Sequence, residues 1–171
     1  MEIRSLRESD DRREFRSGDP DLDRFFLKYA GQNQFRHHIG VTYVAVESEL
    51  MAGYVTVVPS ELEAERMAPT SRKNLPRYPL PVLRLARLAV DESFRQRGVG
   101  RDLLRFVLQL ALRMARELGC TGILVDAKPG AASYYLQYGF IPLETADMIP
   151  ATTATPMFLA IGKIQAAAGH S

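Results

Sequence analysis

The turn near the centre of the chain combines residue types that bind a phosphate group. A largely apolar run, Leu83–Val90, precedes it and suits a buried strand, and an amphipathic helix beginning near Arg101 follows it. Glycine lets the backbone approach a ligand closely, the first amides of a helix have no internal partners, and arginine adds positive charge. The pattern therefore predicts an anion-binding site. The residues that carry this prediction are Arg95, Arg97, Gly98, Gly100 and Arg101.

This turn needs a strand before it and a helix after it. Apolar residues recur at helical spacing through Arg101–Leu118, and Gly119 ends the pattern. A second strand is expected at Thr121–Val125. Together with Leu83–Val90 it makes a right-handed strand–helix–strand unit, which places the two strands parallel.

The flanking segments are expected to be short strands and helices. Asp19 and Pro20 are typical of a helix start, and Gly31 is expected to end that helix before a polar loop, Gln32–Gly40. We expect a connection at Glu47–Ala52 between two strands of a hairpin, and fraying over Ala166–Ser171. The other predicted strands are Glu2–Leu6, Val41–Val46, Gly53–Val58, Phe140–Leu143 and Pro156–Ile161, and the other predicted helices are Glu61–Met67 and Ala131–Tyr138.

Composition indicates an ordinary globular protein. With 171 residues, 46% of them apolar and 25% charged, we expect a single domain over 1–171. The net charge is only +2, although 18 of the 22 basic residues are arginine. Met1 is followed by charged residues and no run reaches membrane-span length, so a cytoplasmic protein is expected. The one cysteine, Cys120, excludes a disulfide or a multi-cysteine metal site within the chain and suits a buried, inert thiol.

The spacing Arg-x-x-Gly-x-Gly, preceded by Leu88–Asp91, resembles the acetyl-CoA pyrophosphate loop of the GNAT superfamily of N-acetyltransferases. This resemblance implies an α+β fold of three layers: a mixed, mostly antiparallel twisted sheet with a central splayed parallel strand pair, and helices on both faces. It also implies acetyl-CoA as cosubstrate and no metal. The cofactor-binding residues that it implies are Leu88, Ala89, Val90, Arg95, Gln96, Arg97, Gly98, Val99, Gly100, Arg101 and Ser133.

A second segment, Ser133–Phe140, resembles the part of the same family in which an aromatic-Tyr pair on a short helix precedes Gly-Phe. Tyr135 falls on the tyrosine position, and Tyr134 stands where phenylalanine is commoner. The reaction expels a thiolate, and a phenol with an ordinary pKa of about 10 is protonated at neutral pH and able to act as a general acid. Tyr135 is therefore the predicted catalytic residue; the alternative is that it only packs between helix and sheet.

The resemblance also implies that the pantetheine arm of acetyl-CoA inserts where Leu88–Val90 and Ile123–Val125 splay apart, adding there like an extra strand. Asp91 would end the first strand without a catalytic part. No general base stands out among the acidic residues near the hairpin. This favours an α-amine acceptor, whose pKa of about 7.7–8.0 lies well below the value of about 10.4 for lysine. The acidic residues in question are Glu47, Glu49, Glu61 and Glu63.

The N-terminal block Phe15–Phe25, with Gly53-Tyr54, Pro81-Val82-Leu83 and Arg87–Asp91, resembles GNAT toxins of bacterial toxin–antitoxin pairs. Those enzymes acetylate the α-amine of aminoacyl-tRNA and are held inactive by a small DNA-binding antitoxin. Two alternatives stay open: a housekeeping acetyltransferase for a small amine or a protein N-terminus, and a silent acyl-CoA-binding module. A homodimer is a further possibility. The long loop Ser60–Pro81 is expected to form a lid or docking loop.

Basic residues before and within the central strand are predicted to form a positive rim where an acceptor stem would lie. They are Arg72, Lys73, Arg77, Arg84 and Arg87.

Overall fold

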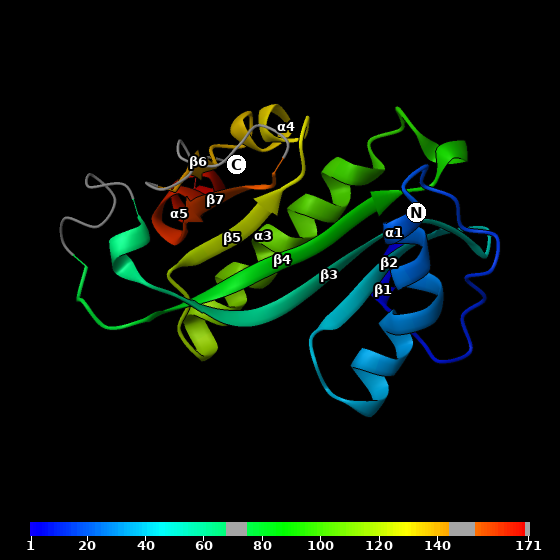
Figure 1. Cartoon of the computed structure of the whole chain (residues 1–171), viewed down its shortest axis with the longest axis horizontal. Coiled ribbons are helices and arrows are strands. Elements are labelled where there is room, and N and C mark those ends of the chain that lie inside the picture. The colour runs from blue at the N-terminus through cyan, green and yellow to red at the C-terminus, as the bar shows by residue number, and fades with distance from the viewer. Residues whose placement is uncertain (68–74, 144–152, 170–171) are drawn as a thin grey trace. The chain divides into compact units, whose positions relative to one another are not determined.

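The structure, a computed structural model, describes residues 1–67, 75–143 and 153–169 of the chain. In these residues seven strands form one mixed sheet, in the order β1-β2-β3-β4-β5-β7-β6 (Figure 1). Strands β4 and β5 are its parallel pair. The α+β fold expected from the sequence is therefore confirmed.

The strands are β1 (Glu2–Ser5), β2 (Val41–Glu47), β3 (Leu50–Leu62), β4 (Leu80–Val90), β5 (Gly122–Ala127), β6 (Ile141–Pro142) and β7 (Thr155–Ala160). The α-helices are α1 (Pro20–Arg24), α3 (Val99–Glu117), α4 (Ala132–Leu136) and α5 (Ile161–Gly169). Two π-helical turns, Phe25–Tyr29 and Gln32–Arg36, follow α1, and short 3-10 turns occupy Ala64–Arg66 and Glu92–Phe94.

The chain forms two compact units. The first comprises Met1–Val58 and Leu85–Val107, and the second comprises Pro59–Arg84 and Leu108–Ser171. Strands β3 and β4 and helix α3 contribute residues to both units. The expectation of a single domain stays a prediction.

Tyr54 is the centre of the core on one face of the first unit. Its side chain is fully buried, and its ring stacks on Phe26 with the centroids 4.3 Å apart. The ring of Phe15 meets it edge-on at 5.6 Å, and the Tyr54 hydroxyl donates a hydrogen bond of 2.8 Å to the carbonyl oxygen of Leu22. Because buried phenols need a polar partner, this bond fixes the N-terminal helix on the strands.

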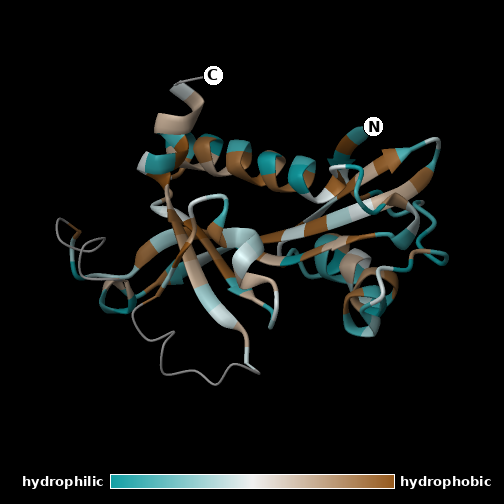
Figure 2. Cartoon of the chain, turned by 90° about the horizontal axis from the view of Figure 1, so that it is seen from above, coloured by the Kyte–Doolittle hydropathy of each residue, from teal (hydrophilic) through white to brown (hydrophobic). Residues whose placement is uncertain are grey.

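Gly53, the neighbour of Tyr54 on β3, serves the opposite face of the same strands. Side chains alternate along a strand, so a Cβ on Gly53 would face α3. That Cβ would lie 2.9 Å from Val99 Cγ1 and 3.0 Å from Leu103 Cδ1. The first turns of α3 therefore lie directly on the strands. Bands of apolar and polar residues run along this helix in Figure 2, as its predicted amphipathic pattern requires.

The N-terminal helix starts as predicted and ends later than predicted. The Asp19 side chain accepts hydrogen bonds from the backbone N–H groups of Asp21 and Leu22. Gly31 does not end the helix, since its backbone is helical and the π-helical turn Gln32–Arg36 follows. In a π-helical turn the hydrogen bonds skip one residue, which leaves a carbonyl to be satisfied from elsewhere. Arg12 donates to the carbonyl oxygen of Phe26 at 2.6 Å, so the cause lies far away in the sequence.

The hairpin between β2 and β3 is tighter than the six-residue connection predicted. Only Ser48 and Glu49 separate the strands, with φ of 50° and 66°. Two consecutive positive φ values define a type I′ turn, which usually carries Asn or Gly. Serine and glutamate at these positions gave no such signal, and a bulge between Ala45 and Val46 shifts the register further.

In the second unit, β5 and β7 pair antiparallel over six residues each. Leu62, Leu124 and Phe158 belong to its core. Strand β7 leads directly into α5, where the sequence predicted a frayed end from residue 166; residues 170–171 lie outside the described part. Cys120 is buried as predicted, with its thiol donating to the carbonyl oxygen of Gly122 at 3.3 Å. Residues 68–74 of the predicted lid, with Arg72 and Lys73 of the predicted rim, also lie outside the described residues.

Replacing Gly53 with alanine tests how closely α3 lies on the strands. The added methyl group would meet Val99, Leu103 and the carbonyl oxygen of Ala89 at 3.0 Å or less. Such overpacking typically costs about 1–3 kcal/mol, so the urea midpoint should fall accordingly. Gly162→Ala, where nothing lies within 4 Å of the added Cβ, is the matched control and should lose no stability. A Gly53→Ala protein as stable as the wild type would contradict this packing.

Candidate functional site

The turn between β4 and α3 has the backbone geometry of an anion site. Gln96 and Gly98 have positive φ values of 60° and 79°. The N–H of Asp102 donates to the carbonyl oxygen of Gly98 at 3.0 Å, and α3 begins at Val99, two residues earlier than predicted. The amides of Val99, Gly100 and Arg101 therefore belong to the first helical turn, where N–H groups point out along the axis. These amides and the positive end of the helix dipole favour a bound anion.

The arginines of the turn are not equivalent. Arg95 donates to the carbonyl oxygen of Ser17 at 2.7 Å. Arg97 pairs with Glu47 at 2.8 Å, and its guanidinium lies 4.9 Å from the centroid of the Phe94 ring. Arg101 folds over the turn, because a Cβ on Gly98 would lie only 2.7 Å from its Nη2 atom. Of the three predicted positive side chains, two thus join the turn to other segments.

Among the other predicted cofactor residues of β4 and α3, exposure separates backbone roles from side-chain roles. The side chains of Ala89 and Val99 are buried, with 5% and 1% of their surface exposed. Only the backbone groups of these two residues are open to a ligand. Leu88 and Val90 are half-buried.

Asp91 connects the N-terminal block to the turn. Its carboxylate accepts hydrogen bonds from the backbone N–H groups of Arg16 at 3.0 Å and Ser93 at 2.8 Å. Its own N–H donates to Ala52 at 2.9 Å, and the N–H of Glu92 donates to Arg16 at 2.8 Å. This supports the structural part expected for Asp91. The link to Arg16, 75 residues away, left no signal in the sequence, although Asp followed by Ser two residues later is typical of a local Asx turn.

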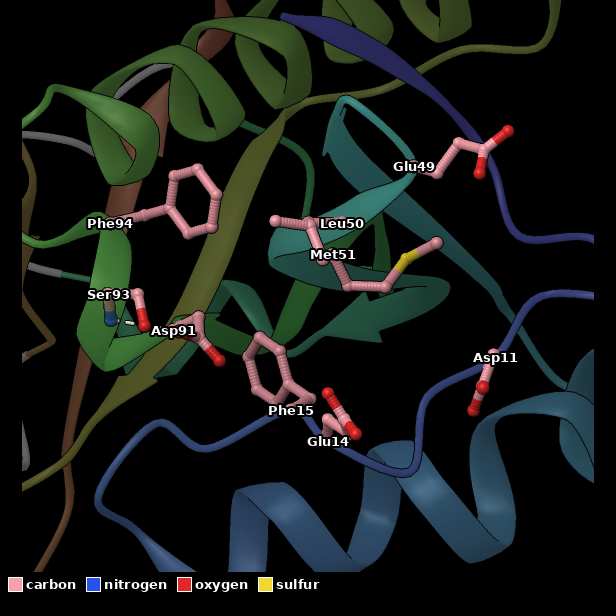
Figure 3. A pocket seen from close by; sticks show the side chains of 9 residues that line it. All are labelled: Asp11, Glu14, Phe15, Glu49, Leu50, Met51, Asp91, Ser93 and Phe94. Atoms are coloured by element: carbon pink, nitrogen blue, oxygen red, sulfur yellow. Dashed lines mark hydrogen bonds between the residues drawn. The ribbon is translucent and has the colours of Figure 1, made fainter.

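A cavity of about 220 Å³ lies beside Asp91 (Figure 3). Phe15, Phe94 and Met51 give it an apolar lining, and Glu14 and Glu49 contribute carboxylates. Its negative charge disfavours a phosphate, so it is distinct in character from the predicted anion site of the turn. Two of the glutamates considered as general bases are now placed: Glu49 in this lining and Glu47 on Arg97.

Tyr135 lies on α4, in the second unit. Only 6% of its surface is exposed, and burial raises the pKa of its phenol to about 12. Its ring meets Tyr134 and Phe140 edge-on, with centroids 5.3 and 5.4 Å away. Gly139, with φ of 94°, turns the chain back so that Phe140 reaches this ring. Ser133, the cofactor residue predicted on the same helix, is exposed.

The parallel pair is anchored in the second unit near its start. The N–H of Thr121 donates to the carbonyl oxygen of Pro81 at 2.7 Å, and Arg84 pairs with Asp126 at 2.9 Å. The predicted splay between Leu88–Val90 and Ile123–Val125 stays a prediction. No helix among the described residues is long and apolar enough to span a membrane.

Residues 38–142 match the family model of the acetyltransferase (GNAT) domain, which is more than half of the chain. The protein therefore belongs to the GNAT acetyltransferase family, and the class of enzyme expected from the sequence is confirmed.

Individual relatives narrow the comparison. The chain is 30% identical over 138 residues to a tRNA-acetylating toxin of Mycobacterium tuberculosis (strain ATCC 25618 / H37Rv), covering 80% of this chain and 82% of the relative. A crystal structure of a bacterial toxin is similar with a TM-score of 0.86 and 25% identity, over 99% of this chain and 96% of that one. AtaTR bound with AcCoA is similar with a TM-score of 0.78 and 25% identity, over 97% and 96%.

Gly100→Glu tests the turn as the acetyl-CoA site. The new side chain puts bulk and negative charge at the second residue of α3, so calorimetry should show loss of acetyl-CoA binding in a folded protein. Gly162→Glu is the matched control, because Gly162 is the second residue of α5 and has open space around it. It should bind acetyl-CoA like the wild type. Unchanged affinity in folded Gly100→Glu would refute the site.

Tyr135→Phe tests the predicted acid. It should keep acetyl-CoA binding and lose turnover by about 10²–10⁴, because only the phenolic proton is removed. Tyr134→Phe, one residue away, should lose far less. With a pKa of about 12 the phenol of Tyr135 stays protonated through pH 10, so the wild-type rate should show no alkaline fall below that pH. The reverse ranking of the two variants, measured by release of free CoA, would place the acid on Tyr134.

Proposed function

We propose that the protein transfers an acetyl group from acetyl-CoA to the α-amine of aminoacyl-tRNA. The observation that carries this proposal is the 30% identity, over four-fifths of the chain, to a tRNA-acetylating toxin. AtaT, whose complex with acetyl-methionyl-tRNAfMet has the same fold at a TM-score of 0.83 and 23% identity over 97% of this chain and 98% of that one, is consistent with it. The N-terminal block Phe15–Phe25, held on β4 by Asp91, is the part of the sequence that resembles such toxins.

Acetyl-CoA is proposed to bind with its pyrophosphate on the amides of Gly98–Arg101. The positive φ of Gly98, the helix dipole and the side chain of Arg101 support this placement. The pantetheine arm would then follow β4, with backbone groups near Leu88 and Val90 contacting its amides and the thioester carbonyl. The complex of AtaTR with AcCoA is consistent with the same donor.

The proposed reaction is a direct displacement. The neutral α-amine attacks the thioester carbonyl carbon, forming the N–C bond and a tetrahedral intermediate. The C–S bond then breaks, and the departing thiolate of CoA takes the phenolic proton of Tyr135. The amine releases one proton, which returns the enzyme to its starting state through solvent. An α-amine with a pKa of about 7.7–8.0 is partly neutral at pH 7, so the reaction needs no strong base.

An enzyme of this kind needs a partner that restrains it. We propose a small DNA-binding antitoxin, as in the KacTA-DNA complex, whose fold is similar with a TM-score of 0.78 and 23% identity over 99% of both chains. Because both substrates are cytoplasmic, we place the protein in the cytoplasm.

Labelled acetyl-CoA tests the acceptor directly. The protein should transfer label to charged bulk tRNA and not to the same tRNA after deacylation. Raising salt should suppress the transfer steeply, because phosphate contacts release counterions when they form. A small neutral amine would show almost no salt dependence and serves as the comparison. Turnover of small amines with no label in charged tRNA would instead favour the housekeeping acetyltransferase.

A further inference from the structure

Arg87 lies in the middle of β4 with its guanidinium against an aromatic ring. The carbon atom at the centre of the guanidinium is 3.7 Å from the centroid of Phe25, the first residue after α1. At this distance the planar cation rests on the face of the ring. Such stacking holds the guanidinium in place and leaves the N–H groups around its edge directed outward.

The surroundings of Arg87 are poorly solvated. The residue is half-buried, and Phe25 has only 6% of its surface exposed. Its charge is felt at the buried phenol of Tyr54, where it opposes the upward shift that burial causes in the pKa of that group. Charge-assisted hydrogen bonds are stronger in such a setting than at an open surface.

Among the described residues, the other arginines of β4 and its turn have polar partners. Arg84 pairs with Asp126, Arg97 pairs with Glu47, and Arg95 donates to Ser17. The hydrogen bonds and ion pairs found in the same residues do not include Arg87, whose contact is the ring of Phe25. A half-buried guanidinium of this kind is suited to an external oxyanion, which its planar fork grips with two parallel hydrogen bonds.

The face of the strand indicates which substrate supplies the oxyanion. Side chains at alternate positions share a face, so Arg87 projects on the same side as Ala89, which packs in the core with Phe25 and Tyr54. That side is covered by the N-terminal block, the segment that resembles tRNA-acetylating toxins. The anion site of the turn, by contrast, is made by the first residues of α3.

We propose that Arg87, oriented by Phe25, binds a phosphodiester oxygen near the 3′ end of the acceptor tRNA and so makes the enzyme specific for a nucleic-acid-linked amine. This inference rests on the proposed function. It assigns Arg87 to acceptor binding and leaves acetyl-CoA binding to the turn.

Two acceptors that differ only in their phosphates test the proposal. One is charged tRNA, and the other is an aminoacyl-adenosine, which carries the same ester and amine without a phosphodiester. Arg87→Gln should raise KM for charged tRNA about 10- to 100-fold, as expected for a lost charge-assisted hydrogen bond. Its kcat, its KM for the aminoacyl-adenosine and its KM for acetyl-CoA should stay close to the wild-type values. The salt dependence of log KM for charged tRNA should weaken by about one phosphate contact.

Three further variants complete the design. Arg87→Lys keeps the charge and loses the planar fork, so its KM for charged tRNA should lie between those of the wild type and Arg87→Gln; it also serves if Arg87→Gln fails to fold. Phe25→Leu removes the stacking and should raise the same KM by a smaller factor. Arg113→Gln, which removes an exposed arginine paired with Glu117 on α3, is the control and should change nothing.

The outcomes separate the two claims. If the wild-type protein acetylates charged tRNA but Arg87→Gln has an unchanged KM for it, the phosphate assignment is wrong. An equal loss on both acceptors would also overturn it, because a purely structural role for Arg87 predicts that result. If the wild-type protein acetylates neither acceptor, the proposed function itself fails and this inference falls with it.

Discussion

The carboxylate of Asp91 accepts the backbone N–H groups of Arg16 and Ser93 at the point where β4 ends. This pair of hydrogen bonds joins segments that are 75 residues apart in the sequence. The Ser93 bond starts the 3-10 turn that leads to Gln96 and Gly98, and the Arg16 bond holds the N-terminal block beside the same strand. With only 9% of its surface exposed, Asp91 makes these bonds largely shielded from water, where they are strong.

The arginines of the turn reinforce that connection. Arg95 donates to Ser17, and the neighbouring Gly18 has φ of 94°, in a position where a Cβ would lie 2.8 Å from the Arg95 guanidinium. Arg97 is held by Glu47 at the end of β2. Charge that the sequence assigned wholly to the anion is therefore shared with the scaffold. The positive end of α3 and Arg101 become the main attractions for a phosphate, and the proposed donor and acceptor segments share one network of hydrogen bonds.

Local chemistry made the order of elements predictable. Asp19-Pro20 started a helix where expected, Gly119 followed α3, and the glycine turn lay between a buried strand and that helix. The failures share one cause, which is that distant partners override local signals. Arg12 satisfies the carbonyl of Phe26, so the helix passes Gly31. Pairing of β2 with β3 forces positive φ on Ser48 and Glu49. Likewise, the stacking of Arg87 on Phe25 joins residues 62 positions apart, which no short motif encodes.

Amide hydrogen exchange with and without CoA tests the shared network most directly, because it reports backbone protection segment by segment. CoA should slow exchange in the peptide that spans Gly98–Arg101, where its pyrophosphate is expected to bind. If Asp91 and Arg95 join the two segments as described, the same ligand should also slow exchange around Ser17, although the ligand does not contact that block. Protection of the turn with no change around Ser17 would contradict the coupling. Protection elsewhere, with the turn unchanged, would contradict the site itself.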